Sequence, residues 1–187
     1  NIDITGPRQE DKDTVANSTK FAGTNFTDPN FEIPSDWRVQ LAADYSFDIP
    51  GVGDNFLFTA EYLYKKAENT AYWQDASLFG DEDGFTADGG RKIYADADGS
   101  TKDIMLTNAD VDGRSKIFSF VLNKNWDSGV SMTASYTNQD ITDSHTSTSA
   151  TAGSSYGFNT TINRNDAIVG RSTFETEHRL VLNLGYE

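Results

Sequence analysis

Between residues 37 and 49 the chain reads WRVQLAADYSFDI, with apolar and polar side chains alternating along its length. The apolar side carries the odd-numbered residues Trp37, Val39, Leu41, Ala43, Tyr45, Phe47 and Ile49. Strict period two predicts a β-strand with one apolar and one polar face. Strands of soluble proteins usually have about 5–6 residues, whereas a tilted membrane-spanning strand needs about 9–11. The length and the polar second face favour a strand of an outer-membrane β-barrel.

Further segments with the same alternation predict strands at 55–66, 115–126, 130–141 and 178–187. Short turns that contain glycine, at 50–54 and 127–129, predict two antiparallel hairpins. The other two connections, about 67–113 and 142–176, are long, and the first contains a candidate short strand at 104–107. Outer-membrane barrels likewise have short periplasmic turns and long extracellular loops.

The predicted fold class is therefore mainly β, an antiparallel meander of about five long strands over residues 37–187. Residues 1–36 are polar and interrupted by Gly6-Pro7, Asp28-Pro29 and Ile33-Pro34, which indicates a lead-in loop. Small barrels need about 8 strands, so we expect a segment of a larger barrel. In isolation its unpaired edges would leave two alternatives, a sheet curled onto its apolar face or strand pairing between copies.

The composition of the chain excludes some classes of partner and of metal site. The net charge is -14, with 29 acidic and 15 basic residues, so the chain would repel nucleic-acid phosphates. There is no cysteine, which excludes a disulfide framework and a thiolate metal site. The mean hydropathy of -0.57 is compatible with a barrel wall, since barrel strands alternate and their loops are polar.

Several motifs resemble the barrels of TonB-dependent outer-membrane receptors, in particular the Oar-like, carboxypeptidase-regulatory-domain type. The clearest is DPNFEIPSDW at 28–37, which runs into the strand RVQL at 38–41. The next hairpin is similar at LTNAD (106–110), GRS (113–115), NWDSGV (125–130) and ASYT (134–137), and EHRLV (177–181) resembles the strand after the second long loop. The resemblance covers roughly residues 28–187.

This resemblance implies a barrel of about 22 strands occluded by a plug domain. It implies solute uptake across the outer membrane of a Gram-negative bacterium, with the long loops extracellular. The expected partners are outer-membrane lipid and an unknown transported solute. The plug domain and the energising TonB protein would act only through the full-length parent, and no family ligand residues carry over.

A second hypothesis is a soluble extracellular β-sandwich, a binding or adhesion module of which a carbohydrate-binding module is one form. It explains the low hydropathy and the aromatic residues of the first long loop. In a sandwich the apolar strand faces are buried, whereas in a barrel they face lipid and require detergent. No constellation of residues supports an enzyme.

The first long loop holds the candidate ligand-binding residues, because loops on a rigid scaffold often carry recognition. They are the aromatics Tyr72, Trp73, Phe85 and Tyr94, which alternate with acidic clusters. The alternative is that these aromatics form a small core that orders the loop. The acidic residues Asp81, Asp83, Asp96 and Asp98 are weak candidates for a calcium site, since carboxylates are calcium ligands. Apart from this calcium, no cofactor is expected.

Overall fold

The computed structural model describes residues 9–16, 23–95, 102–145, 149–159 and 161–187. The chain is mainly β and its sheets are mostly antiparallel, as the sequence predicts, and no barrel is closed. The largest sheet contains five long strands in the order β2-β3-β8-β9-β11. Their bounds are Ser35–Ile49, Gly53–Glu68, Arg114–Asn125, Val130–Asp143 and His178–Tyr186. The two-residue strand β10 (Gly170–Arg171) also pairs with β9, beyond the start of β11.

Both predicted hairpins are confirmed. β2 pairs antiparallel with β3, and β8 with β9. The first turn is tighter than expected, because β3 begins at Gly53 and the Val52 amide donates to the Ile49 carbonyl at 3.0 Å. Gly51 adopts a φ of 81°, a left-handed conformation that glycine accepts without strain.

The register confirms the predicted apolar face. Val39, Leu41, Ala43, Tyr45 and Phe47 of β2 lie opposite Tyr64, Tyr62, Ala60, Phe58 and Phe56 of β3, in that order. Directly opposed residues project to the same side of a sheet. The pairing of β8, β9 and β11 continues this face through Phe118, Phe120, Leu122, Tyr136, Ala134, Leu180, Leu182 and Leu184.

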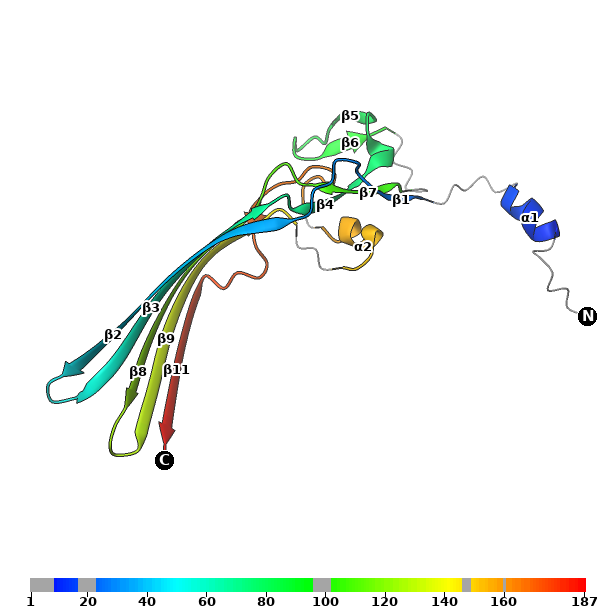
Figure 1. Cartoon of the computed structure of the whole chain (residues 1–187). Helices are drawn as coiled ribbons and strands as arrows, with labels where there is room; N and C mark the ends of the chain where they lie inside the picture. The colour runs from blue at the N-terminus through cyan, green and yellow to red at the C-terminus, as the bar shows by residue number, and fades with distance from the viewer. Residues whose placement is uncertain (1–8, 17–22, 96–101, 146–148, 160) are drawn as a thin grey trace, which may run out of the picture.

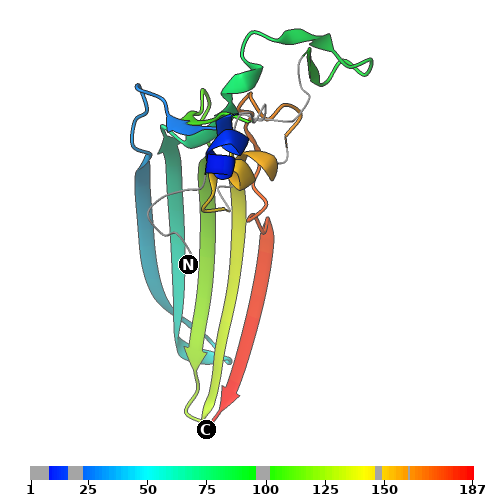
Figure 2. The same ribbon diagram turned by 90° about the vertical axis from the view of Figure 1, so that its right-hand side faces the viewer.

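The five strands form one curved layer whose apolar face is open (Figures 1 and 2). Leu41 is 65% exposed, Leu182 60% and Leu180 78%. The sequence left two alternatives open, a sheet curled onto its apolar face and strand pairing between copies. The first is not observed, because the sheet does not fold back on this face. Within the described part of the chain, the only large apolar side chain of the five-stranded sheet that is buried is Phe56, next to the first turn.

The other face is polar and bonded across the strands. The Thr59 hydroxyl donates to Asp44 Oδ1 at 2.6 Å, and the Thr133 hydroxyl donates to Asn123 Oδ1 at 2.8 Å. Gln40 donates from its side-chain amide to the Glu61 carboxylate. The two faces of the sheet therefore suit two different environments.

The long connections gather at one end of the sheet and both short turns lie at the other (Figure 1). The first connection is not structureless: it holds the strands β4 (Ala71–Asp75), β5 (Glu82–Phe85), β6 (Lys92–Tyr94) and β7 (Ile104–Asn108), with the 3-10 turn η1 (Ala76–Leu78). The second holds the short helix α2 (Ala152–Gly157) and β10. The predicted short strand at 104–107 is confirmed as β7.

The expected lead-in loop at 1–36 also has structure. It contains the helix α1 (Gln9–Ala16) and the strand β1 (Asn25–Thr27), which pairs in parallel with β7 in the small sheet β1-β7-β4. Asp28 ends β1 and fixes it, because its carboxylate accepts from the Asn30 amide and the Thr107 hydroxyl, both at 2.8 Å. Neither element has the apolar periodicity that predicts structure from sequence. No helix in the described ranges is long and apolar enough to cross a membrane.

Candidate functional site

The two long loops dock on each other through side chain to main chain hydrogen bonds. Asn165, in the second loop, accepts from the Asp75 amide at 2.8 Å and donates to the Asp75 carbonyl at 2.9 Å. This pair of bonds imitates a neighbouring strand along β4. Gln74 adds a bond to the Asn165 carbonyl at 2.8 Å. The loop assembly (residues 69–112 with 149–169, within the described ranges) is therefore an ordered body.

Tyr72 is the centre of that assembly. It is 1% exposed, and its hydroxyl lies 3.0 Å from the carbonyl oxygens of both Arg164 and Asp166. Asn159 also donates to the hydroxyl at 3.3 Å. Burial raises the pKa of Tyr72 to about 12, so the phenol stays protonated as a donor.

His145 packs against the same core. It is buried, its ring lies 5.0 Å from that of Trp73, and its Nε2 is 3.1 Å from the Ser155 carbonyl oxygen. Burial lowers the pKa of His145 below its ordinary value of 6.5. The imidazole is therefore held neutral in the folded loop.

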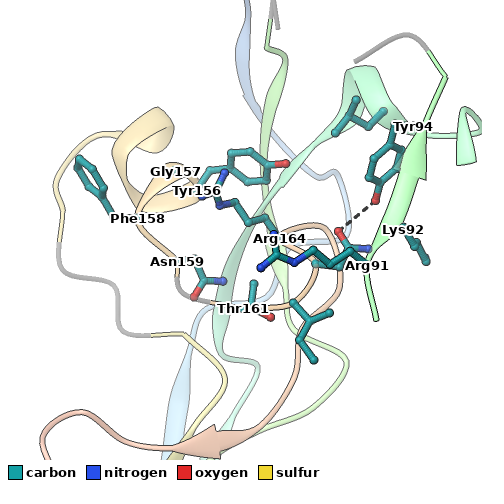
Figure 3. Close-up of a pocket in the computed structure, with 12 residues that line it drawn as sticks. Arg91, Lys92, Tyr94, Tyr156, Gly157, Phe158, Asn159, Thr161 and Arg164 are labelled. Carbon is teal, nitrogen blue, oxygen red and sulfur yellow. Dashed lines mark hydrogen bonds between the residues drawn. The ribbon is translucent and has the colours of Figure 1, made fainter. Parts of the chain in front are cut away.

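A cleft of about 600 Å³ opens beside this core, between β6 and the segment that follows α2. Figure 3 shows Lys92 and Tyr94 projecting from the β6 side, Tyr156 and Phe158 from the α2 side, and Arg164 between them. Arg91, Asn159, Thr161 and Asn163 complete the polar part of the lining. A volume of this size is in the range of small-molecule sites.

The charge of the cleft is opposite to that of the chain. Arg91, Lys92 and Arg164 line it, and no acidic residue does. Lys92 is paired with Asp166 at 3.0 Å. Within the described residues, no ion pair joins the guanidinium of Arg91 or Arg164 to a carboxylate. Two exposed guanidinium groups therefore remain for a ligand.

The candidate ligand residues divide between core and surface. Tyr72 is a buried residue whose hydroxyl is bonded to the Arg164 and Asp166 carbonyls and to Asn159, as the alternative of a loop core predicts. Trp73 is half-buried, and its ring packs in a tilted arrangement against that of His145. Phe85 is 64% exposed on β5 and does not line the cleft. Tyr94 lines the cleft, and its hydroxyl donates a hydrogen bond to Asn163 Oδ1 at 3.1 Å.

Of the four calcium candidates, the structure describes only Asp81 and Asp83. Asp81 and Asp83 belong to the stretch around β5, and no group of three or more His, Asp or Glu side chains in the described ranges is placed to hold a metal ion. Asp96 and Asp98 lie outside the described residues. The first long loop, although rich in acidic residues, contributes Arg91 and Lys92 to the cleft.

Sequence analysis missed Arg91, Lys92 and Arg164 as site residues. The signal was weak but present: the two long loops contain five basic residues, and the other two are Lys102 and Arg171. Roughly seventy residues separate Arg91 from Arg164, so only the fold brings them into one cleft.

A smaller cavity of about 350 Å³ adjoins the cleft and shares Asn159, Thr161 and Ile162 with it. Two hydroxyls in its lining, Ser144 Oγ and Thr161 Oγ1, are buried without a hydrogen-bond partner. Buried hydroxyls are normally satisfied, and a cavity of this polarity holds water readily.

Comparison with known proteins gave no match to a family model, to a curated protein or to a solved structure.

Proposed function

We propose that the five-stranded sheet is part of the barrel wall of an outer-membrane TonB-dependent receptor, and that the loop assembly faces the cell exterior. The observation that carries the proposal is the uncovered apolar face of a single-layer sheet whose opposite face is polar. In water such a surface would be an aggregation liability, whereas lipid covers it without cost.

The dimensions agree with a bilayer. The thirteen residues from Trp37 to Ile49 extend about 40 Å along the strand, which a tilt of about 45° reduces to about 28 Å. This matches an apolar band about 25 Å tall and a hydrocarbon core about 30 Å thick.

The polar residues at both ends of the apolar face also fit a sheet that spans a bilayer. At the loop end the face meets the opposed pair Lys116 and Asp140. At the turn end it meets Lys124, whose ammonium lies 5.4 Å from the centre of the Phe56 ring and 5.6 Å from that of Trp126. A lysine that buries its stem among aromatic rings and directs its charge to the rim is typical of a membrane interface.

Solute uptake is the function that the family resemblance implies, and the arrangement of loops supports it. All long connections lie at one end, where they form the cleft, and recognition by loops on a rigid scaffold is common. The chain would serve as wall and exterior loops, with no enzymatic step. The alternative sandwich requires a second sheet over the apolar face, and the described residues contain none.

The location is tested in the cells that produce the protein, with an antibody raised against the chain. We expect the antigen in the outer-membrane fraction after a sodium carbonate wash, and we expect protease added to intact cells to cleave within 69–112. An antigen released by carbonate, or cleavage at the turns 50–52 and 127–129 instead, would contradict the proposal.

Uptake is tested separately by comparing growth media of the wild type and a deletion strain. We expect at least one dissolved compound to be depleted only by the wild type, and a protonophore to abolish its depletion. Depletion that the protonophore leaves unchanged would argue against an energised receptor.

A further inference from the structure

We propose that the cleft between β6 and the segment after α2 binds a small solute that carries two oxyanion groups, such as carboxylates or phosphates. Arg91 and Arg164 are the two primary contacts. The binding itself does not depend on where the sheet resides, but its use in solute capture rests on the function proposed above.

The first argument is electrostatic. The whole chain carries a net charge of -14, so its overall field repels anions. The cleft nevertheless presents three basic side chains and no acidic one. Like charges gathered at one site oppose folding, and a bound anion relieves that repulsion. Such a local reversal of charge indicates an anionic ligand.

The second argument concerns which cations are available. Lys92 is already held by Asp166, and Asn163 donates to the same carboxylate at 2.8 Å. The guanidinium groups of Arg91 and Arg164 have no such partner within the described ranges. A guanidinium presents a planar fork of donors that matches a carboxylate or phosphate in bidentate geometry. Two free forks fit a ligand with two oxyanion groups.

The third argument is the neutral part of the lining. Thr161 Oγ1 is buried without a partner in the wall of the cleft, and the ring of Phe158 is exposed at its edge. A water in the adjoining cavity can link this hydroxyl to a polar ligand, and the ring offers an apolar surface. The cleft therefore suits an organic anion with a ring or carbon skeleton better than a bare inorganic ion.

The test is isothermal titration calorimetry of the full chain in detergent micelles. One arm uses digalacturonate, with its dimethyl ester as the neutral control, and the other uses glucose 1,6-bisphosphate, with glucose as the control. We expect at least one anion to bind about tenfold or more tightly than its neutral control, and we expect salt to weaken that binding. The arm with the tighter ligand identifies the oxyanion as carboxylate or phosphate.

Variants locate the site. R91Q and R164Q should each weaken binding of that anion by about tenfold. R179Q is the matched control, because Arg179 lies in β11 on the polar face of the sheet and does not line the cleft. Hydrogen exchange over residues 70–78 verifies that each variant keeps the loop fold.

Three results would overturn the proposal: neutral and charged ligands that bind equally, R91Q and R164Q proteins that bind as the wild type does, or an R179Q protein that loses as much affinity. None of these results bears on the membrane location. Conversely, a protein that binds these anions but is absent from the outer membrane would overturn only the function proposed above.

Discussion

Arginine in place of Leu41 would put a charge in the middle of the apolar face. Leu41 lies near the centre of β2, opposite Tyr62, and 65% of it is exposed. Val39 and Ala43 flank it on the same face. Gln40, the residue next to it in sequence, points to the polar face and bonds to Glu61. The two positions form a matched pair that differs in face alone.

The expected cost follows from that placement. If lipid covers the apolar face, a cation near the bilayer midplane costs about 2–4 kcal/mol. That range lowers the folding equilibrium constant by about 30- to 700-fold, since 1.4 kcal/mol is a factor of ten. Gln40→Arg places its cation beside the Glu61 carboxylate in a wet environment, so its effect should stay within about 1 kcal/mol.

The assay is guanidinium chloride unfolding of the protein in phosphatidylcholine vesicles, followed by tryptophan fluorescence. Trp37 and Trp126 lie at opposite ends of the sheet and report on its integrity. We expect Leu41→Arg to lower the unfolding midpoint and Gln40→Arg to leave it nearly unchanged. Equal shifts at the two positions would refute the assignment of faces, and a larger shift at Gln40 would reverse it.

Three further predictions concern the loop assembly and the turn end. Asn165→Ala leaves the Asp75 amide and carbonyl unpaired, so we expect a loss of about 1–3 kcal/mol of local stability, measured as faster hydrogen exchange of the Asp75 amide. Because burial lowers the pKa of His145, the folded loop is favoured while the imidazole is neutral, so its contribution is full above pH 6.5 and declines as the pH falls below that value. Faster exchange of residues 70–78 at pH 5 than at pH 7.5, after correction for intrinsic rates, would show this, and His145→Gln should remove the difference. Lys124→Gln removes two cation–π contacts and the bonds of the ammonium to Asp54, so it should lower the unfolding midpoint by the equivalent of about 1–2 kcal/mol, while Lys116→Gln, at a half-buried site, should change it less than half as much.

The strands and their pairing were predictable because one physical rule specifies them. Period-two alternation identifies a strand and also states which side chains share a face, and a tight turn then fixes the register. Alternation alone predicts Val39 opposite Tyr64 and Phe47 opposite Phe56, because both residues of each pair are apolar. The turn places Ile49 opposite Gly53, and a register shift between Phe47 and Ile49 brings the apolar residues back onto one face. A slip of one residue would have put every apolar side chain on the polar face, so the pattern permits little error.

The loop assembly obeys no such rule. Its decisive contacts, such as Asn165 with the main chain of Asp75, join residues ninety positions apart through single polar side chains. The strand β1 pairs in parallel with β7 over three residues, too few for any alternation to appear in the sequence. For Tyr72, burial favours a core role over ligand contact, and the sequence does not encode this burial locally.

Buried side chains are distributed unequally between the sheet and the loop assembly. Of the four apolar side chains in the described ranges that are buried, Tyr72, Ile104 and Tyr156 belong to the loop assembly. The loops thus carry their own small core and a hydrogen-bonded frame, which is what an ordered body in water needs. The sheet has most of the apolar area and almost none of the burial. In the function proposed above, lipid covers this open apolar surface. The cleft, with its basic lining, then lies on the aqueous side, where a dissolved anion can reach it.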